Sequence, residues 1–185
     1  MSTPDAHGRS SHGAPRLLII DDDPRLHDDY RRCLGPPTTQ GEGLRARREA
    51  LFGPEPSALG VTDVRFELVH ALSGASGLTH LRESVAADDP FSVAFVDMRM
   101  PPGWNGVETI RELWSTDPDL QMVVCTAYSD FTWDAVIAGV GRSEGLHLLR
   151  KPFGGDQVRR FAEVLTKKWQ LARAAERGVA RAGSR

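Results

Sequence analysis

The sequence contains few cysteines, little net charge and no long apolar segment. Its two cysteines, Cys33 and Cys125, are too few for the disulfide framework of a small secreted domain, which favours a reducing compartment. The formal net charge of −2 argues against a protein that coats DNA or an anionic membrane. No apolar run approaches the roughly 18 residues of a membrane span, and residues 1–13 lack the apolar segment of a secretory signal. The sequence therefore predicts a soluble, cytoplasmic protein without a membrane segment.

Length and composition are typical of one globular domain with additional segments. Hydrophobic residues make up 40% and charged residues 26% of the 185 residues, as in ordinary globular proteins. Residues 1–14 are rich in Ser, Gly, His and Pro without periodicity, so we expect a disordered leader. We expect one domain over residues 15–168, followed by a helical extension or tail over residues 169–185.

Short apolar runs alternate with segments of helical spacing along this domain. Strands are predicted over residues 17–20, 64–71, 91–96, 120–125 and 146–149, and helices over 24–34, 75–87, 107–114, 132–140 and from about 156. This alternation predicts an α/β fold of three layers, a doubly wound (βα)5 parallel sheet with helices on both faces. Residues 36–62 exceed a normal connection, and we interpret them as an insertion between the first helix and the second strand, with a short helix over 44–52.

Polar residues with distinct chemistry follow four of the predicted strands. Asp21 and Asp22 follow the first strand, Asp97 the third, Thr126 the fourth and Lys151 the fifth. The carboxyl ends of parallel strands meet at one edge of the sheet, where open α/β sheets bind their ligands. Three carboxylates in one cleft repel each other unless a cation joins them, and an oxygen-only set open to water suits Mg²⁺.

This set of residues is chemically sufficient to capture a phosphoryl group. A carboxylate beside Mg²⁺ can attack phosphorus and form an acyl phosphate, while Lys151 and the Thr126 hydroxyl neutralise the other oxygens. Each residue alone also has an ordinary interpretation, as a helix cap, a turn residue, a strand end or a solvated lysine. Their joint placement at one edge of the sheet favours the functional interpretation.

The motifs together resemble the receiver domain of two-component response regulators. The resemblance rests on residues 17–24, 95–101, 125–127 and 151–152, and it extends over about residues 16–168. It implies the flavodoxin-like strand order 2-1-3-4-5. It also implies a phosphoprotein switch in a phosphorelay, in which Asp97 accepts a phosphoryl group from a histidine kinase or histidine phosphotransfer protein. Such a receiver is not an enzyme beyond its own phosphorylation and dephosphorylation.

The resemblance assigns a role to each site residue. Mg²⁺ is held directly by Asp22, Asp97 and the backbone carbonyl of Arg99, whereas Asp21 acts through water. Thr126 and Lys151 contact the phosphoryl group, and the bond between Lys151 and Pro152 is expected to be cis. The resemblance does not identify the downstream partner.

Three features depart from the usual receiver pattern. The loop over residues 101–106 is one residue longer and carries Trp104, which we expect near the cleft. Leu148 stands three positions before the lysine, where receivers often have Tyr or Phe, so an aromatic switch is not expected to operate there in the usual form. The insertion over residues 36–62 is the third.

Several other residues have ordinary predicted roles. We expect His27 at a solvated helix position rather than as a metal ligand, and His70 shows no ligand spacing. Cys125 is interpreted as a small core residue without a reactive thiol. The helix from Trp169 onward is either a solvated tail or a surface for dimerisation or a partner. Nucleic-acid binding is not expected because no aromatic platform or helix-turn-helix follows.

Two alternative functions remain open from the sequence. One is a phosphatase or phosphotransferase enzyme with an aspartyl-phosphate intermediate; such enzymes commonly place a second acid two residues after the nucleophile, where this sequence has Arg99. The other is a pseudo-receiver that binds partners without phosphorylation, although none of the five site residues is missing.

Overall fold

Five parallel strands form the centre of the protein. The computed structural model describes residues 13–35, 64–127 and 132–182. The strands are β1 (Arg16–Ile20), β2 (Glu67–Ala71), β3 (Phe91–Asp97), β4 (Gln121–Ala127) and β5 (Leu146–Lys151). Their order in the sheet is β2-β1-β3-β4-β5, and every neighbouring pair is parallel. The predicted α/β class and the strand order 2-1-3-4-5 are confirmed.

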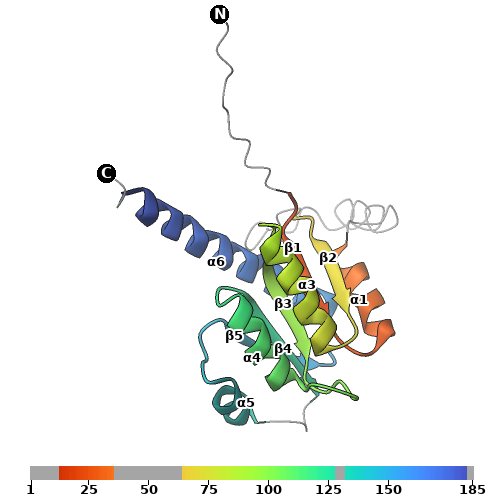
Figure 1. Ribbon diagram of the computed structural model, residues 1–185. Helices are drawn as coiled ribbons and strands as arrows, with labels where there is room; N and C mark the ends of the chain where they lie inside the picture. The colour runs from red at the N-terminus through yellow and green to blue at the C-terminus, as the bar shows by residue number, and fades with distance from the viewer. Residues whose placement is uncertain (1–12, 36–63, 128–131, 183–185) are drawn as a thin grey trace, which may run out of the picture.

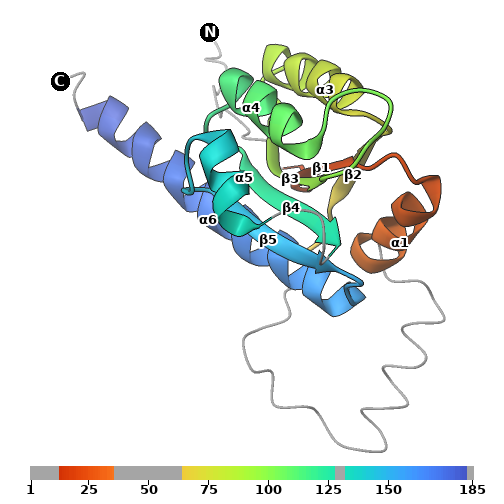
Figure 2. The same cartoon turned by 90° about the horizontal axis from the view of Figure 1, so that it is seen from below.

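The helices lie on the two faces of the sheet (Figures 1 and 2). They are α1 (Pro24–Leu34), α3 (Gly74–Ala86), α4 (Gly106–Thr116), α5 (Trp133–Val140) and α6 (Gly155–Ala182). Figure 2 shows α1 and α6 on one face and α3, α4 and α5 on the other. Each described helix falls short of the combination of length and apolarity that a membrane span requires.

The sheet separates two apolar cores because side chains alternate along each strand. On β1, Leu18 and Ile20 belong to the core beneath α3, α4 and α5, whereas Leu17 and Ile19 belong to the core beneath α1 and α6. All four of these side chains are fully buried. Burial on both faces explains why the strands are continuous apolar runs in the sequence.

Most predicted element boundaries agree with the structure to within a few residues. The largest difference among the strands is at β2, which begins at Glu67 instead of Val64. The helix predicted over residues 44–52, the rest of the 36–62 insertion and most of the 1–14 leader lie outside the described residues. The predicted domain boundaries therefore stay predictions.

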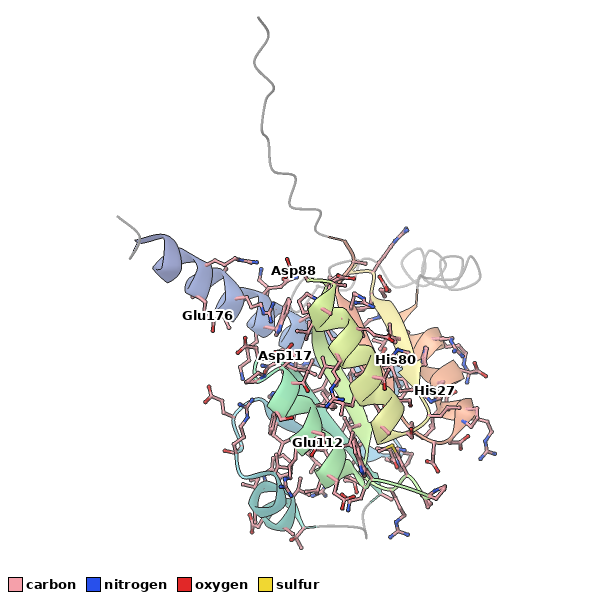
Figure 3. All side chains as sticks on the ribbon, in the orientation of Figure 1. His27, His80, Asp88, Glu112, Asp117 and Glu176 are labelled. Atoms are coloured by element: carbon pink, nitrogen blue, oxygen red, sulfur yellow. The ribbon has the colours of Figure 1, made fainter. Side chains whose placement is uncertain are left out.

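The last helix is continuous across residue 169 and extends past the edge of the sheet (Figure 1). The Arg173 guanidinium lies 3.8 Å from Asp117 and 3.9 Å from Asp119, and it stacks on the Trp169 ring at 4.8 Å. Residues 174–178 are exposed, and Figure 3 shows Glu176 on this projecting part. The tail and interaction-surface interpretations of this segment both remain open.

The loop after β3 returns to the sheet through a close backbone contact at Gly106. A Cβ atom at this position would lie 2.7 Å from the Asp97 carbonyl oxygen and 2.8 Å from the Met98 Cα. The Gly106 N–H also donates to the Met98 carbonyl over 3.1 Å. Since backbone atoms cannot move aside cheaply, glycine is required where α4 begins beside Asp97.

We expect Gly106→Ala to lower the free energy of unfolding by about 1–3 kcal/mol, because the new methyl group overlaps the Asp97 and Met98 backbone. Urea denaturation followed by circular dichroism measures this loss. Gly178→Ala is the matched control, since that helical position has open space around it, and alanine there should be neutral or stabilise by up to about 1 kcal/mol. Equal stability of both variants would contradict the close-contact explanation.

Candidate functional site

The register of the sheet brings the predicted site segments to one edge. Asp97, the last residue of β3, lies opposite Cys125 of β4, and Ala127 lies opposite Lys151 of β5. On the other side of β3, Ile20 pairs with Val96, so the chain leaves β1 beside Asp97. Residues far apart in sequence therefore meet at the carboxyl ends of β1, β3, β4 and β5.

The ammonium group of Lys151 joins two carboxylates at this edge. Its Nζ donates to Asp21 Oδ2 over 2.8 Å and to Asp97 Oδ1 over 2.6 Å. The side chains of Asp21 and Asp97 are only 3% and 10% exposed, against 22% for Lys151. Burial alone would lower the pKa of Lys151, but the hydrogen bonds and charges of Asp21 and Asp97 outweigh it and raise that pKa above its ordinary value.

Backbone amides hold the remaining oxygens of the two buried carboxylates. The Asp23 N–H donates to Asp21 Oδ1 over 3.0 Å, and the Arg99 N–H donates to Asp97 Oδ2 over 2.8 Å. Each carboxylate thus accepts one charged and one backbone hydrogen bond. These bonds fix the orientation of both acids before any ligand binds.

Asp22 and Thr126, the other two predicted site residues, are less closely connected to the cluster of Asp21, Lys151 and Asp97. Asp22 is exposed, and it makes no hydrogen bond or ion pair with the described residues. The buried Thr126 hydroxyl donates to the Ala127 carbonyl over 3.0 Å rather than to Asp97. The structure thus brings Asp21, Asp97 and Lys151 into contact and places Asp22 and Thr126 on the adjoining strand ends.

The chemistry of this site fits a magnesium ion. Within the described residues no three His, Cys, Asp or Glu side chains form a metal-binding group, and Lys151 bonds to both Asp21 and Asp97. The side-chain donors are nevertheless carboxylate oxygens, and one of the three carboxylates belongs to the exposed Asp22. Three carboxylates exceed one ammonium by two charges, which a divalent cation that keeps several waters would balance.

A largely apolar cavity of about 570 Å³ adjoins the site. Its lining includes Leu26 and Tyr30 of α1, Phe153, Val158 and Lys151. The cavity therefore shares Lys151 with the site.

The predictions for residues around the site had mixed outcomes. The peptide bond between Lys151 and Pro152 is cis as expected, and so is the bond between Pro101 and Pro102, which was not expected. Trp104 is partly buried and packs against the core beneath α3 and α4. Cys125 is buried, and its Sγ lies 3.2 Å from the Tyr30 hydroxyl, where either group can donate the hydrogen bond. Burial raises the pKa of the Cys125 thiol to about 12, so the thiol stays protonated.

The prediction for His27 was wrong. Its side chain is only 3% exposed, and Figure 3 shows it where α1 meets the side of the sheet formed by β2. His27 Nε2 lies 2.7 Å from the Asp21 carbonyl oxygen, and its Nδ1 lies 2.7 Å from Nδ1 of His70 on β2. Helical spacing could not reveal this contact, because it depends on β2, a strand that pairs with β1 from more than forty residues away.

No family model matches the chain, and no curated protein matches its sequence. Solved structures do match. One is named adenylate cyclase from Rhodopirellula baltica, with a TM-score of 0.63, 23% identity, and coverage of 91% of this chain and 98% of that chain.

Most of the similar structures are CheY-like response-regulator receiver domains. The receiver domain from Methanospirillum hungatei has a TM-score of 0.59 at 16% identity and covers 86% of this chain and 99% of its own. The receiver domain of NtrX from Brucella abortus has a TM-score of 0.54 at 18% identity and covers 82% of this chain and 98% of its own. The chain therefore has the flavodoxin-like fold of CheY-like receiver domains.

We expect His70 to make stability dependent on pH. Burial, Arg31 and His27 lower the pKa of His70 from 6.5 to about 4. Between these values the unfolded chain binds the extra proton, so stability is retained above pH 6.5 and falls as the pH drops toward about 4. His70→Asn removes this titration while its amide can replace the Nδ1–H donor.

Urea denaturation at about pH 7.5 and about pH 5 tests this expectation. The loss of unfolding free energy between the two conditions should be larger for the wild type than for His70→Asn. The pKa of His147 is also lowered, by burial and by Lys168. Because His147 is present in both proteins, its contribution to the pH dependence cancels in the comparison. An identical pH dependence would show that His70 does not contribute.

Proposed function

We propose that the protein is a response-regulator receiver that accepts a phosphoryl group on Asp97. The donor is a histidine kinase or a histidine phosphotransfer protein, the reaction depends on Mg²⁺, and phosphorylation switches a partner-binding surface. The observation that carries this proposal is the ammonium of Lys151, which contacts Asp97 and Asp21 over 2.6 and 2.8 Å at the carboxyl edge of a receiver fold.

The transfer is a displacement at phosphorus. An Asp97 carboxylate oxygen forms a new O–P bond, the N–P bond of the donor phosphohistidine breaks, and the departing imidazole takes a proton from solvent. Lys151 orients the Asp97 carboxylate through its hydrogen bond and supplies positive charge to the phosphoryl oxygens. The Arg99 N–H on the other Asp97 oxygen keeps the carboxylate plane fixed.

The residues that would hold Mg²⁺ are Asp22, Asp97 and the Arg99 carbonyl, with Asp21 acting through water. Bound there, the ion would neutralise charge on the phosphoryl oxygens. The backbone contact of Asp97 with Arg99 and the exposure of Asp22 to water support this assignment.

The switch would begin at Thr126. Its hydroxyl now donates to the neighbouring Ala127 carbonyl, a local bond that a phosphoryl group with stronger acceptor oxygens can replace. Such a movement would shift the surface formed by α5 and β5. Leu148 on β5 packs partly buried against the core, so this surface would respond without an aromatic side chain at that position.

The cavity beside Lys151 is the surface on which we propose the phosphodonor docks. The lining includes Lys151, which contacts the reacting carboxylate over 2.6 Å, and the partly buried apolar side chains Leu26 and Phe153. Further burial of these two side chains would favour association. The cytoplasmic location and a homodimer stay predictions, and the downstream partner is not identified.

Incubation with acetyl phosphate and Mg²⁺, followed by intact-mass measurement, tests the proposed function. We expect the mass to increase by one phosphoryl group and the increase to be absent in Asp97→Asn. Asp117→Asn is the matched control because Asp117 is also a buried aspartate, at the end of α4, and it should be phosphorylated like the wild type. Rapid multiple turnover would favour the enzyme alternative, and no phosphorylation of the wild type would favour the pseudo-receiver.

Lys151→Ala should change phosphorylation and metal binding in opposite directions. Without the ammonium, three carboxylates repel each other more strongly, so we expect Mg²⁺ to bind several-fold more tightly, by about 2- to 10-fold. The phosphorylation rate should fall by about 10-fold or more, because one charged contact to the transferred group is lost. Mg²⁺ titration and the acetyl phosphate assay measure the two effects.

Lys167→Ala is the control for this experiment, since Lys167 is an exposed lysine on α6 far along the helix from the site. It should leave both quantities unchanged. A parallel loss of metal binding and phosphorylation in Lys151→Ala would contradict the competition between ammonium and metal ion.

A further inference from the structure

Two imidazole rings link β2 to the backbone of the first site acid. His27 on α1 and His70 on β2 are in edge contact, with ring centroids 4.8 Å apart and ring planes at 77°. Their Nδ1 atoms are 2.7 Å apart, and His27 Nε2 is 2.7 Å from the Asp21 carbonyl oxygen. Neither residue takes part in the chemistry proposed for Asp97, although their chain of contacts ends at Asp21.

For two neutral rings, the contacts determine which nitrogen atoms carry protons. A carbonyl oxygen can only accept, so His27 Nε2 must carry the proton and donate it to Asp21. In a neutral ring the His27 Nδ1 is then an acceptor, so the proton between the two rings belongs to His70 Nδ1. His70 Nε2 is therefore the unprotonated nitrogen, and it is buried without a hydrogen-bond partner among the described residues.

This series of hydrogen bonds completes the set of contacts that hold Asp21 in place. The Asp21 N–H donates to the Ala71 carbonyl at the end of β2 over 3.1 Å, and its side chain accepts from Asp23 and Lys151. The carbonyl accepts from His27, one turn into α1, and has no other partner among the described residues. A buried carbonyl without a donor is costly, and the peptide could rotate to reach water.

We propose that His27 is a positioning residue that orients the Asp21–Asp22 segment for Mg²⁺, and that His70 fixes the tautomer of His27 for this task. The inference rests on the proposed function, since it assigns a role at the same site. Rotation of the Asp21–Asp22 peptide would move the exposed Asp22 carboxylate relative to Asp97, and the two acids must converge on one ion. Groups that orient metal ligands typically change metal affinity by about 10- to 100-fold.

The test compares Mg²⁺ affinity in His27→Leu and His27→Gln. Leucine fills the buried space but cannot donate, so we expect the dissociation constant for Mg²⁺ to rise by about 10-fold. The glutamine amide can reach the position of Nε2 and donate to the Asp21 carbonyl, so affinity should stay within about 3-fold of the wild type. Isothermal titration with magnesium chloride measures both values, and denaturation curves confirm that each variant is folded.

Trp114→Phe is the matched control for a merely structural role. The Trp114 indole N–H donates to the Leu120 carbonyl over 2.8 Å, so it is also a ring N–H bonded to a backbone carbonyl, but at the opposite end of β4. Its loss should lower stability and leave Mg²⁺ affinity unchanged. A folded His27→Leu protein with wild-type affinity would overturn the inference.

His70 gives a second test in case His27→Leu does not fold. His70→Asn retains a donor near the Nδ1 position and should bind Mg²⁺ like the wild type, whereas His70→Val should weaken binding by about 3-fold or more. Equal affinities in these two variants would contradict a role for His70.

The tautomers are measurable without any metal. Nitrogen-15 NMR of the wild type should show the proton on Nε2 of His27 and on Nδ1 of His70, and the opposite assignment would refute the hydrogen-bond chain. A wild-type protein with these tautomers that binds no Mg²⁺ would refute the proposed function, and the positioning role with it, while leaving the chain itself intact.

Discussion

The structure depends on one charged contact, in which a lysine ammonium is shared between two buried carboxylates. Two carboxylates this close together in so little water would repel each other. Lys151 removes that conflict by donating to both Asp21 and Asp97, and the hydrogen bonds raise its own pKa despite burial. The same contact orients the Asp97 carboxylate, which the proposed attack on phosphorus requires.

The rest of the fold holds these three groups in register. Parallel strands place the ends of β1, β3 and β5 at one edge, and their apolar side chains fill the cores on both faces. Asp23 caps α1 directly after the acids, so the helix begins where β1 ends and carries His27 back to the Asp21 carbonyl. Glycine at position 106 allows α4 to begin against the Asp97 backbone. Local features of the sequence thus support the contact between Asp21 and Lys151, which are 130 positions apart.

Much of this arrangement follows from patterns that are local in the sequence. The buried strands are recognisable as apolar runs, and the caps at Asp23 and the turn residues mark where helices begin. Strand order 2-1-3-4-5 was implied by the resemblance to receivers and is confirmed. The prediction that His27 is solvated failed for a physical reason. The exposure of a helix residue depends on what covers the helix, and His27 is covered by β2. The predicted start of β2 was also too early. Val64 and Phe66 are apolar and pack in the core beneath α1 and α6, but they precede Glu67, where β2 begins.

The sequence by itself determined the elements and the chemical types at their ends, since propensity, capping and apolar spacing act over a few residues. It could state that acids, a hydroxyl and an amine would share an edge. Only the tertiary structure decided which of them touch: Lys151 contacts Asp21 and Asp97, whereas Thr126 bonds its neighbour and Asp22 faces water. Hydrogen bonds are sensitive to tenths of an ångström, and such distances depend on how separate strands and helices pack together.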